Sequence, residues 1–479
     1  MKRTGKMKRL FYLSALFMAT VLAGCGEDNA PAPEPSTPTL RLDEETEGTS
    51  PHVLLPGEQY VLDFHAENAE SITAGGLPEG WTVTTDEEKG CMNITAPAEG
   101  DGESDATLRI TATGTGGQSA TADVNFHYVA SFDDPEGTFV LNEGNMTTEN
   151  GSLIYITPQG YVVDNAYRRV NGTYLGNVTQ DMYFHDGKIY IISQNGDINP
   201  TGSSFENDGM LVVADARTLK KIKAYSKEDL AGLDWPTHIA VPDEQHVYIR
   251  DNKGVWRLNM DDTSLAFVEG SDGAPKSRFA VVNGKVYTYY NTSYKIPGLY
   301  EINETGGTKL SLTKFNGITG IAASSDNELW IMSALTFGER YIGKYNPDDK
   351  VLKTNVISEE ANEAYNCTFA AHGNIIYYAS GTSIYRVHFN PENTDKGPQD
   401  EMLVDLSNLD DNARELYNGL GVHPVTGHIY VNTIKGVGNF FTTNSIWEFD
   451  FDANPDTPVH RFDNYTRFPA GAFFNGKYN

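Results

Sequence analysis

The stretch GTFVLNEGNMTTENGSLIYI, residues 137–156, decides the fold because it reads as a strand, a polar turn and a second strand. TFVL (138–141) and LIYI (153–156) are β-branched and aromatic runs, and the segment between them is rich in the Asn and Gly that turns use. The same template returns through the rest of the chain. The stretch is therefore one unit of a repeat rather than an isolated hairpin.

Each half of this template occurs seven times. The first strand returns as KIYII (188–192), HVYIR (246–250), KVYTY (285–289), ELWIM (328–332), IIYYA (375–379) and HIYVN (428–432). The second returns as MLVVAD (210–215), GVWRLN (254–259), GLYEIN (298–303), YIGKYN (341–346), SIYRVHF (383–389) and SIWEFDF (445–451). The repeat length is about 49 residues, which is typical of one four-stranded propeller blade.

A further strand, rich in Gly, Ala and Thr, precedes six of the seven units, and small residues suit the crowded innermost strand of a blade. The first unit lacks this strand, and the missing copy stands near the C-terminus as FPAGAFF (468–474). We therefore predict an all-β protein with a seven-bladed β-propeller over residues 137–479, closed by strand 468–474, which protects both sheet edges. An open sandwich or two unrelated β-domains is the alternative.

The N-terminal segment predicts export and lipid anchoring. Residues 1–9 contain five Lys or Arg and no acid, and residues 11–23 are apolar but too short to span a bilayer. LAGC (22–25) resembles a bacterial lipobox. We predict a signal peptide over residues 1–24, and a lipidated Cys25 with a Pro-rich tether over residues 25–39. An ordinary signal peptide with an incidental Cys is the alternative.

The residues after Cys25 are Gly26-Glu27-Asp28, which resemble the surface-export signal of Bacteroidetes lipoproteins. The expected location is the outer membrane, lipid-anchored and facing the exterior. Residues 40–130 carry short alternating runs typical of an immunoglobulin-like or PKD-like β-sandwich, which we interpret as a stalk joined to the propeller by a hinge at residues 130–136. The predicted strands are residues 60–66, 81–85, 92–96, 107–114 and 122–128.

Composition excludes several function classes. A formal net charge of −29 argues against binding nucleic acid or anionic lipid. Apart from Cys25, only Cys91 and Cys367 remain, in different predicted units, so no disulfide is expected. The eleven His show no metal-ligand spacing, and neither a nucleophile elbow nor a phosphate-binding loop occurs. We predict no metal, no required cofactor and no catalytic residue, and hence no enzyme.

In a propeller, the loops leading into the innermost strands lie on the same face as the loops joining second and third strands. Here these loops carry amides and aromatics, which suit a large, polar, uncharged ligand. Asn and Tyr that merely serve the turns are the alternative. The candidate ligand-binding residues are Asn142, Glu143, Asn145, Gln194, Asn195, Trp235, His238, Arg250, Arg278, Tyr290, Asn291, Tyr294, Arg340, Tyr365, Asn366, Tyr417, Asn418, Phe440 and Arg467.

Four segments carry a resemblance to a known family. They are LNEGNMTTENGSLIYI (141–156), DGMLVVADARTLK (208–220), GLGVHPVTGHIYV (419–431) and RFPAGAFF (467–474). Through them the chain resembles the YncE-like, seven-bladed propeller lipoproteins of Bacteroidetes, the DUF5074 type. That group includes BtuG-like proteins, which capture cobalamin and pass it to a TonB-dependent outer-membrane transporter. The resemblance implies a corrinoid-binding face and a transporter partner, while the N-terminal sandwich departs from the plainest form of that design.

Two hypotheses follow. In the first, the protein captures a small-molecule nutrient at the cell surface, a corrinoid first and a glycan second, and delivers it to an outer-membrane transporter. In the second, it is a protein-interaction or glycan-binding scaffold whose propeller face docks a partner through aromatic and Arg anchors. An enzyme ranks third, because it would need convergent carboxylates or His with shifted pKa values.

Overall fold

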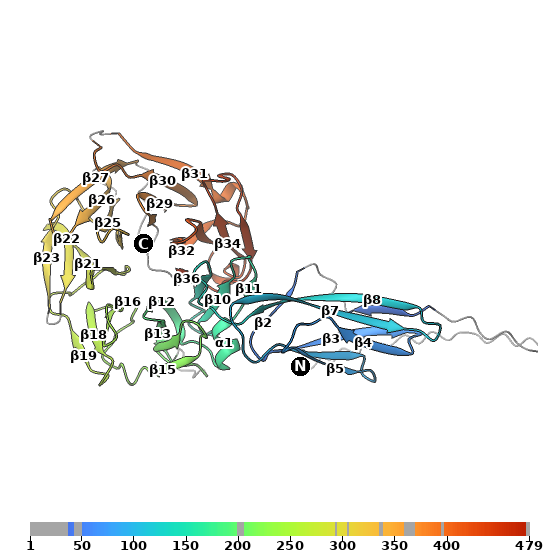
Figure 1. Ribbon diagram of the computed structural model, residues 1–479. Coiled ribbons are helices and arrows are strands. Elements are labelled where there is room, and N and C mark those ends of the chain that lie inside the picture. Colours follow the sequence, from blue (N-terminus) through green and yellow to red (C-terminus); the bar gives the residue numbers. More distant parts are fainter. Residues whose placement is uncertain are drawn as a thin grey trace, which may run out of the picture.

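The computed structural model describes residues 37–42, 50–198, 206–292, 295–303, 306–334, 339–358, 369–393 and 397–475. Within these ranges the strands form nine four-stranded sheets. Seven sheets surround a central channel, and two more form an elongated unit beside the ring (Figure 1). The predicted all-β fold, a seven-bladed propeller with an N-terminal β-sandwich, is confirmed.

The N-terminal unit is a sandwich of two sheets with strand orders β1-β3-β6-β5 and β2-β8-β7-β4. Its strands are β1 (Thr39–Leu42), β2 (His52–Leu54), β3 (Gln59–Glu67), β4 (Ser71–Gly75), β5 (Thr82–Asp86), β6 (Cys91–Thr95), β7 (Glu103–Thr113) and β8 (Ser119–Val129). Leu62, Ile94, Leu108 and Phe126 are fully buried between the sheets. The five predicted strands are all present, whereas β1, β2 and β4 were missed; β1 and β2 are only four and three residues long.

The seven blades follow. Blade 1 contains β9 (Thr138–Asn142), β10 (Ser152–Ile156), β11 (Val162–Val163) and β36 (Pro469–Phe474), with helix α1 (Ala166–Asn171) after it. Blade 2 contains β12 (Asn177–His185), β13 (Lys188–Gly196), β14 (Leu211–Asp215) and β15 (Lys221–Tyr225). Blade 3 contains β16 (His238–Ala240), β17 (His246–Arg250), β18 (Val255–Asn259) and β19 (Leu265–Phe267). Blade 4 contains β20 (Ala280–Val282), β21 (Lys285–Thr292), β22 (Lys295–Ile302) and β23 (Gly307–Ser311).

The remaining blades continue the same meander. Blade 5 contains β24 (Gly320–Ala323), β25 (Leu329–Ser333), β26 (Arg340–Asn346) and β27 (Val351–Ile357). Blade 6 contains β28 (Phe369–His372), β29 (Ile375–Ser380), β30 (Ser383–His388) and β31 (Asp400–Asp405), followed by the short helix η2 (Leu406–Asn408). Blade 7 contains β32 (Glu415–Val422), β33 (Ile429–Ile434), the short helix η3 (Gly438–Phe440), β34 (Asn444–Phe449) and β35 (His460–Asp463).

The C-terminal strand closes the ring, as predicted. β36 pairs antiparallel with β9, from Pro469 opposite Asn142 to Phe474 opposite Thr138. All six residues of β36 are buried. Blade 1 is therefore built from the two ends of the propeller sequence, so neither end leaves an open sheet edge toward the channel.

The sandwich packs tightly against blades 1 and 2, at a contact that we name the joint. Phe132, in the connecting segment, is 1% exposed and packs edge-on against Tyr155 of β10, 5.2 Å away between ring centroids. The Phe132 amide donates to the carbonyl of Arg217 at 2.8 Å. The predicted hinge at residues 130–136 is therefore wrong, because this segment contributes to the shared apolar core.

Charged groups reinforce the joint. Arg169 of helix α1 forms a two-point ion pair with Glu58, through Nε to Oε1 at 2.8 Å and through Nη2 to Oε2, and also donates to the Val53 carbonyl. His127 of β8 is 2% exposed and lies between Asp105, at 2.8 Å from Nδ1, and Glu103, at 3.2 Å from Nε2. Glu58, Glu103 and Asp105 at the joint therefore each have a basic partner.

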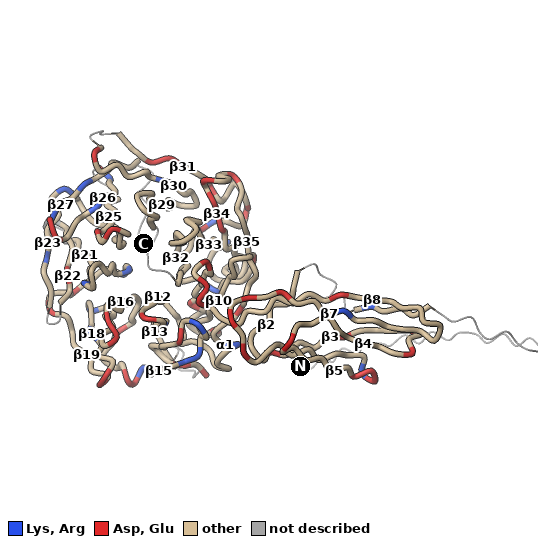
Figure 2. Tube along the Cα trace, in the orientation of Figure 1, with Lys and Arg blue, Asp and Glu red and all other residues tan. Residues whose placement is uncertain are grey.

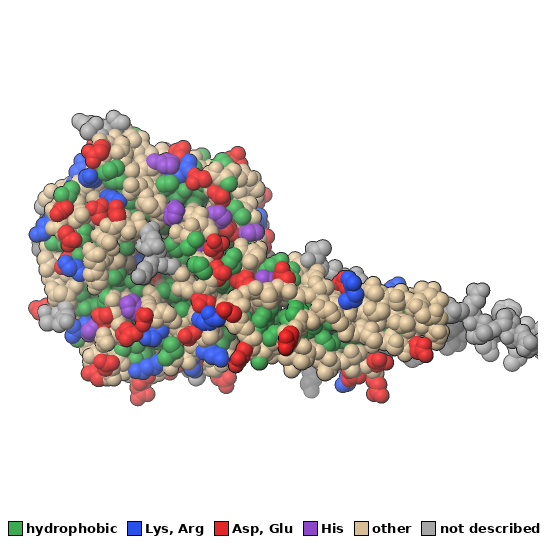
Figure 3. All heavy atoms as spheres, in the orientation of Figure 1, with side chains coloured by type: hydrophobic (Ala, Val, Ile, Leu, Met, Phe, Trp, Pro, Cys, Tyr) green, Lys and Arg blue, Asp and Glu red, His purple; other side chains and the backbone are tan. Residues whose placement is uncertain are grey.

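Many acidic residues and several histidines lie on the strands and turns of the ring. Acidic residues are spread along the outer strands and loops (Figure 2), and several histidines lie on the face in view in Figure 3. Six histidines stand at turns that join first to second or third to fourth strands, namely His185, His246, His372, His388, His428 and His460.

Within the described part of the chain, no helix is both long and apolar enough to cross a membrane.

Candidate functional site

The strand pairing shows where the predicted ligand-binding face lies. In each blade the innermost strand begins where the second strand ends, as for His238 opposite Arg250 in blade 3 and Glu415 opposite Ile434 in blade 7. Loops at these positions therefore lie at one end of the central channel, which we name the channel mouth. Its central residues are Glu143, Gln180, Asp181, His238, Lys276, Arg278, Tyr417 and Asn418.

Glu143 is the carboxylate on which neutral donors converge. It follows β9, and its backbone amide donates to the Phe468 carbonyl at 2.7 Å, which fixes its position beside the closing strand. Its side chain accepts from Asn418 Nδ2 at 2.9 Å and lies 3.5 Å from the Tyr417 hydroxyl. Burial raises the pKa of Glu143 to about 7, against the opposing influences of Lys276 and of hydrogen bonds from Gln180, Tyr417 and Asn418.

A second carboxylate, Asp181, lies in the innermost strand of blade 2. Its Oδ2 accepts from the Ile239 amide of blade 3 at 3.1 Å, and its Oδ1 lies 3.4 Å from Arg278 Nε of blade 4. Burial raises the pKa of Asp181 to about 6, although the Arg278 charge opposes this. The group links three blades at the channel wall.

Arg278 reaches across the channel to blade 1. Its guanidinium lies over the Phe473 ring of β36, 4.3 Å from the centroid. Gly471, with φ +149°, allows this approach, since a Cβ there would lie 2.5 Å from Arg278 Nη2. One guanidinium therefore contacts the closing strand and Asp181 together, so it forms the floor of the channel mouth.

His238 is neutral at this site. It is 7% exposed, and its Nδ1 lies 3.0 Å from the Thr237 hydroxyl. Burial and the positive charges of Arg278, Lys276 and Arg250 lower the pKa of His238 well below its usual value. A neutral imidazole can donate or accept a hydrogen bond without adding charge.

Three predicted amide ligands, Asn142, Asn195 and Asn291, instead clamp the loops of the blades, together with two asparagines that were not predicted, Asn177 and Asn444. Asn291 of blade 4 donates to the Ile318 carbonyl at 2.6 Å and accepts from its amide at 2.8 Å, ahead of blade 5. Asn444 of blade 7 does the same with Thr466, at 2.9 and 3.0 Å, ahead of β36. Both side-chain groups of each Asn are thus used by the fold.

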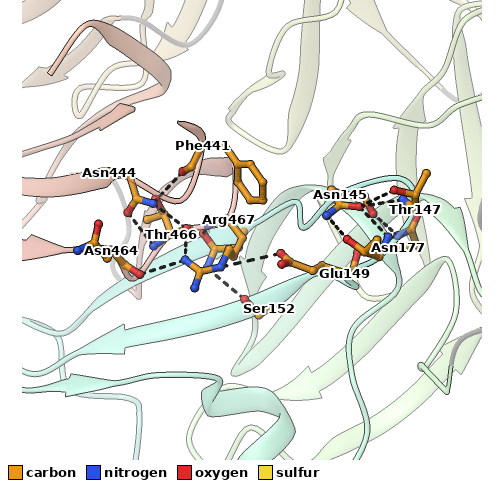
Figure 4. Close-up of polar contacts among 12 residues, drawn as sticks. Asn145, Thr147, Glu149, Ser152, Asn177, Phe441, Asn444, Asn464, Thr466 and Arg467 are labelled. Atoms are coloured by element: carbon orange, nitrogen blue, oxygen red, sulfur yellow. Dashed lines mark hydrogen bonds and ion pairs between the residues drawn. The ribbon is translucent and has the colours of Figure 1, made fainter. Parts of the chain in front are cut away.

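Blades 1 and 2 are joined in the same manner. Asn195 donates to Asn177 Oδ1 at 2.8 Å, and Asn177 donates to the carbonyls of Asn145 and Glu149 at 2.8 and 2.9 Å. Figure 4 shows Asn177 with Asn145 and Glu149, and a second cluster around Arg467 and Asn444. Asn142, fully buried, donates to Ser152 and accepts from the Arg467 amide. We name Asn142, Asn177, Asn195, Asn291 and Asn444 the clamp asparagines.

Other candidates lie around the mouth with partners of their own. Gln194 donates to Gln180 at 3.3 Å. Arg250 donates to the Ala274 carbonyl at 3.0 Å and to the Thr237 hydroxyl at 3.3 Å. Arg467 donates to the carbonyls of Asn464 and Thr466, and Asn145 accepts from the amides of Thr147 and Thr148. The Tyr290 hydroxyl lies 3.5 Å from the Ser311 hydroxyl, and the Lys309 ammonium lies over the Tyr290 ring. Arg340 is buried.

Aromatic side chains give the face its exposed apolar surface. Phe440 is 57% exposed and Trp235 is 42% exposed, on opposite sides of the ring. Phe441 stacks on Phe468 at 4.5 Å, and Phe468 lies 5.4 Å from Tyr417, so an aromatic row leads from the rim to Glu143. Tyr294, Tyr365, Asn366 and the lipidation candidate Cys25 lie outside the described residues.

Sequence reasoning missed Asp181 and Phe468. Asp181 had a usable signal, because it is an acid at the start of DMYFH, one of the strands expected to be innermost, where an unpaired charge is costly. Phe468 was predicted only as the first residue of the closing strand. In the structure it precedes β36, with φ +54°, and its ring contacts the ring of Tyr417.

The channel mouth is a better candidate site than the other features of the described residues. A shallow recess on the sandwich is lined by residues 73–76, Thr107, Arg109 and Thr111, and its one charge, Arg109, is paired with Asp123 at 2.7 Å. Within the described ranges, no cluster of three His, Cys, Asp or Glu could hold a metal ion. Side chains from blades 1, 2, 3, 4 and 7 meet at the mouth.

Comparison with known proteins gives a family. The model of DUF5074, a domain of unknown function, matches residues 136–475. No curated protein matches the chain.

Solved structures give distant similarities. The extracellular domain of a protein described as a hybrid two-component system from B. thetaiotaomicron is 11% identical over 60% of this chain and 33% of that chain, with a TM-score of 0.38. Puromycin hydrolase is 11% identical over 71% of this chain and 52% of that chain, with a TM-score of 0.41. TolB from Acinetobacter baumannii is 13% identical over 60% of this chain and 74% of that chain, with a TM-score of 0.35. The match thus spans about a third of the chain of that extracellular domain.

Proposed function

We propose, from the premise that this chain belongs to the DUF5074 family, that it is a cell-surface capture protein. In this proposal the channel mouth binds a polar small-molecule ligand without turning it over. The protein then delivers the ligand to an outer-membrane transporter of the TonB-dependent type. Lipidation of Cys25 would hold it on the outer membrane, facing the exterior.

One observation carries the proposal: polar side chains from five blades converge at the channel mouth. Glu143, His238 and Asn418 belong to blades 1, 3 and 7, so they meet only there. The blades are rigid supports, since the clamp asparagines fix the surrounding loops. Preorganised donors and acceptors lose little entropy when a ligand binds.

A corrinoid is the first ligand candidate. The sequence resemblance points to it, and its chemistry suits the face. A corrinoid carries amide side chains around a broad flat ring, so it can pair with amide and hydroxyl groups such as those of Asn418 and Tyr417. Exposed aromatic side chains, namely Trp235 and Phe440, offer flat contact area for the ring.

A glycan or a docked protein is the second candidate, favoured by the exposed apolar side chains of the same face. Met146, Ile198, Trp235, Leu409, Val437, Phe440 and Tyr465 stand on loops of this face, each at least 37% exposed. Aromatic platforms of this kind also suit sugar rings and protein hot spots. The two candidates differ in ligand chemistry, and a titration with a corrinoid tests the first of them directly.

The test is calorimetric titration of the full-length protein, in mild detergent, with cyanocobalamin. We expect one-to-one binding that weakens roughly tenfold or more in Tyr417→Ala and Trp235→Ala. His388→Ala, on the opposite face and 62% exposed in its side chain, is the matched control and should bind like the wild type. Absence of both heat and a thermal shift would contradict the corrinoid assignment.

A further inference from the structure

Glu143 is a partly buried carboxylate without a paired cation. No ion pair joins it to a Lys, Arg or His within the described ranges, and its partners Asn418 and Tyr417 are neutral. By contrast, Asp181 has Arg278, and Glu149 on the rim has Arg467 at 4.0 Å. Among these three carboxylates of the face, Glu143 alone has only neutral side chains within hydrogen-bonding distance.

The groups that face Glu143 come from three sides. Gln180 approaches from β12 of blade 2, and Tyr417 and Asn418 approach from β32 of blade 7. Lys276, in the exposed loop before β20, is the cation whose charge reaches it. Arg278 is engaged with Asp181 and Phe473, and His238 is neutral beside these cations.

A bound ligand would cover this carboxylate. Removing water from an ionised carboxylate is expensive unless a cation replaces it, and such groups take up a proton instead. The free protein already has this tendency, because burial raises the pKa of Glu143 to about 7. Asn418 and Tyr417 hold the side chain in place, so it cannot turn away from a ligand.

We propose that ligand capture at the channel mouth takes up one proton from solvent, held on Glu143, so that binding is stronger in acid than in alkali. This inference rests on the proposed function and adds the regulation of that same site. No bond of the ligand forms or breaks, and the proton comes from the buffer. The protonated carboxyl then donates a hydrogen bond, which selects a neutral ligand group with an acceptor oxygen, such as an amide carbonyl.

The test uses full-length protein and cyanocobalamin at pH 5.5, 6.5, 7.5 and 8.5, each in phosphate and in Tris, whose ionisation heats differ. We expect the two buffers to give different heats at the alkaline end, corresponding to uptake of about one proton. The binding constant should fall up to about tenfold per pH unit above pH 7, which is the slope for one proton.

Glu143→Gln mimics the protonated group and should bind at pH 8.5 as the wild type binds at pH 5.5, with equal heats in both buffers. Glu149→Gln, on the rim, should keep the wild-type pH dependence. Binding that is equal at all four pH values, or a Glu143→Gln variant with an unchanged slope, would overturn this inference and leave capture standing. Absence of cyanocobalamin binding at every pH would contradict the corrinoid assignment and this inference together.

Discussion

The joint and the channel mouth both contain buried carboxylates, but the carboxylates of the joint have basic partners, whereas one at the mouth has neutral hydrogen-bond donors. At the joint, Glu58 is paired with Arg169, and the buried His127 has a carboxylate on each ring nitrogen. At the mouth, Glu143 has neutral donors, and the nearby cation Lys276 lies in an exposed loop. The joint satisfies its own charges, whereas the mouth leaves one to be satisfied by water, a proton or a ligand.

This comparison shows that the type of a polar residue does not tell whether it stabilises the fold or belongs to the candidate site. His127 and His238 are both almost fully buried, at 2% and 7% exposure. The carboxylates Glu103 and Asp105 outweigh burial and raise the pKa of His127, whereas burial and three cations lower the pKa of His238. The first histidine therefore has carboxylate partners that favour its charged form, and the second is a neutral polar group at the candidate site.

The largest expected effect breaks the apolar part of the joint. Phe132→Ala should lower the free energy of unfolding by about 3–4 kcal/mol, because it leaves a cavity against Tyr155 in the shared core. Urea denaturation followed by fluorescence measures this loss. Phe440→Ala, at the exposed rim, should change stability by less than about 0.5 kcal/mol. Equal losses in the two variants would contradict the packing of the joint.

Breaking the ion pair of the joint should have a smaller effect. Glu58→Ala should destabilise the protein by about 2 kcal/mol, because it leaves the half-buried Arg169 guanidinium without its carboxylate. Adding Arg169→Leu should recover part of the loss, since the stranded charge is then gone. A double-mutant cycle on the unfolding free energies measures the coupling, and strict additivity of the two changes would contradict it.

At the mouth, removing a charge should stabilise the protein. The pKa of Glu143 is raised from 4.5 to about 7, so the folded state binds the extra proton and its stability falls as pH rises between these values. Glu143→Gln should therefore gain on the order of 1–2 kcal/mol at pH 8 and nothing near pH 4. Thermal unfolding at both pH values measures this. Destabilisation at pH 8 would show that the carboxylate is satisfied like those of the joint.

The smallest effect concerns His127. Because its pKa in the folded protein is raised above 6.5, its contribution is complete below pH 6.5 and is lost as pH rises through the folded value. The stability difference between wild type and His127→Gln should therefore shrink from pH 6 to pH 9, by about 1 kcal/mol or less. Urea midpoints of both proteins at each pH give the difference. A gap that widens toward pH 9 would contradict the raised pKa of His127.

Much of the fold follows from local sequence pattern. The β-branched runs and their spacing predict the blades, and FPAGAFF at 468–474 predicts the closure, because both are repeated and local. The joint could not be predicted. The segment ASFDDPE reads as a polar linker, yet Phe132 is buried by side chains such as Tyr155 and Tyr167, which come from other parts of the sequence.

The candidate site was predicted only as a face. Glu143, His238, Arg278, Tyr417 and Asn418 do meet at the channel mouth, because loop position follows from strand order. The role of each amide depends on its partner, which the sequence does not give. Asn291 and Asn418 both stand on loops of this face, yet the first clamps Ile318 and the second donates to Glu143.

The closing strand has a consequence for folding kinetics. The contact between the Arg467 amide and Asn142 joins residues 325 positions apart, so it is among the least local contacts in the chain. Such contacts form late and slowly, because the entropy of the intervening chain must be lost first. Phe468, which packs on Tyr417, and Phe473, which packs on Arg278, arrive with this strand. The candidate site is therefore expected to be assembled last, and a chain stalled before that step would have blades 2 to 7 but an incomplete channel mouth.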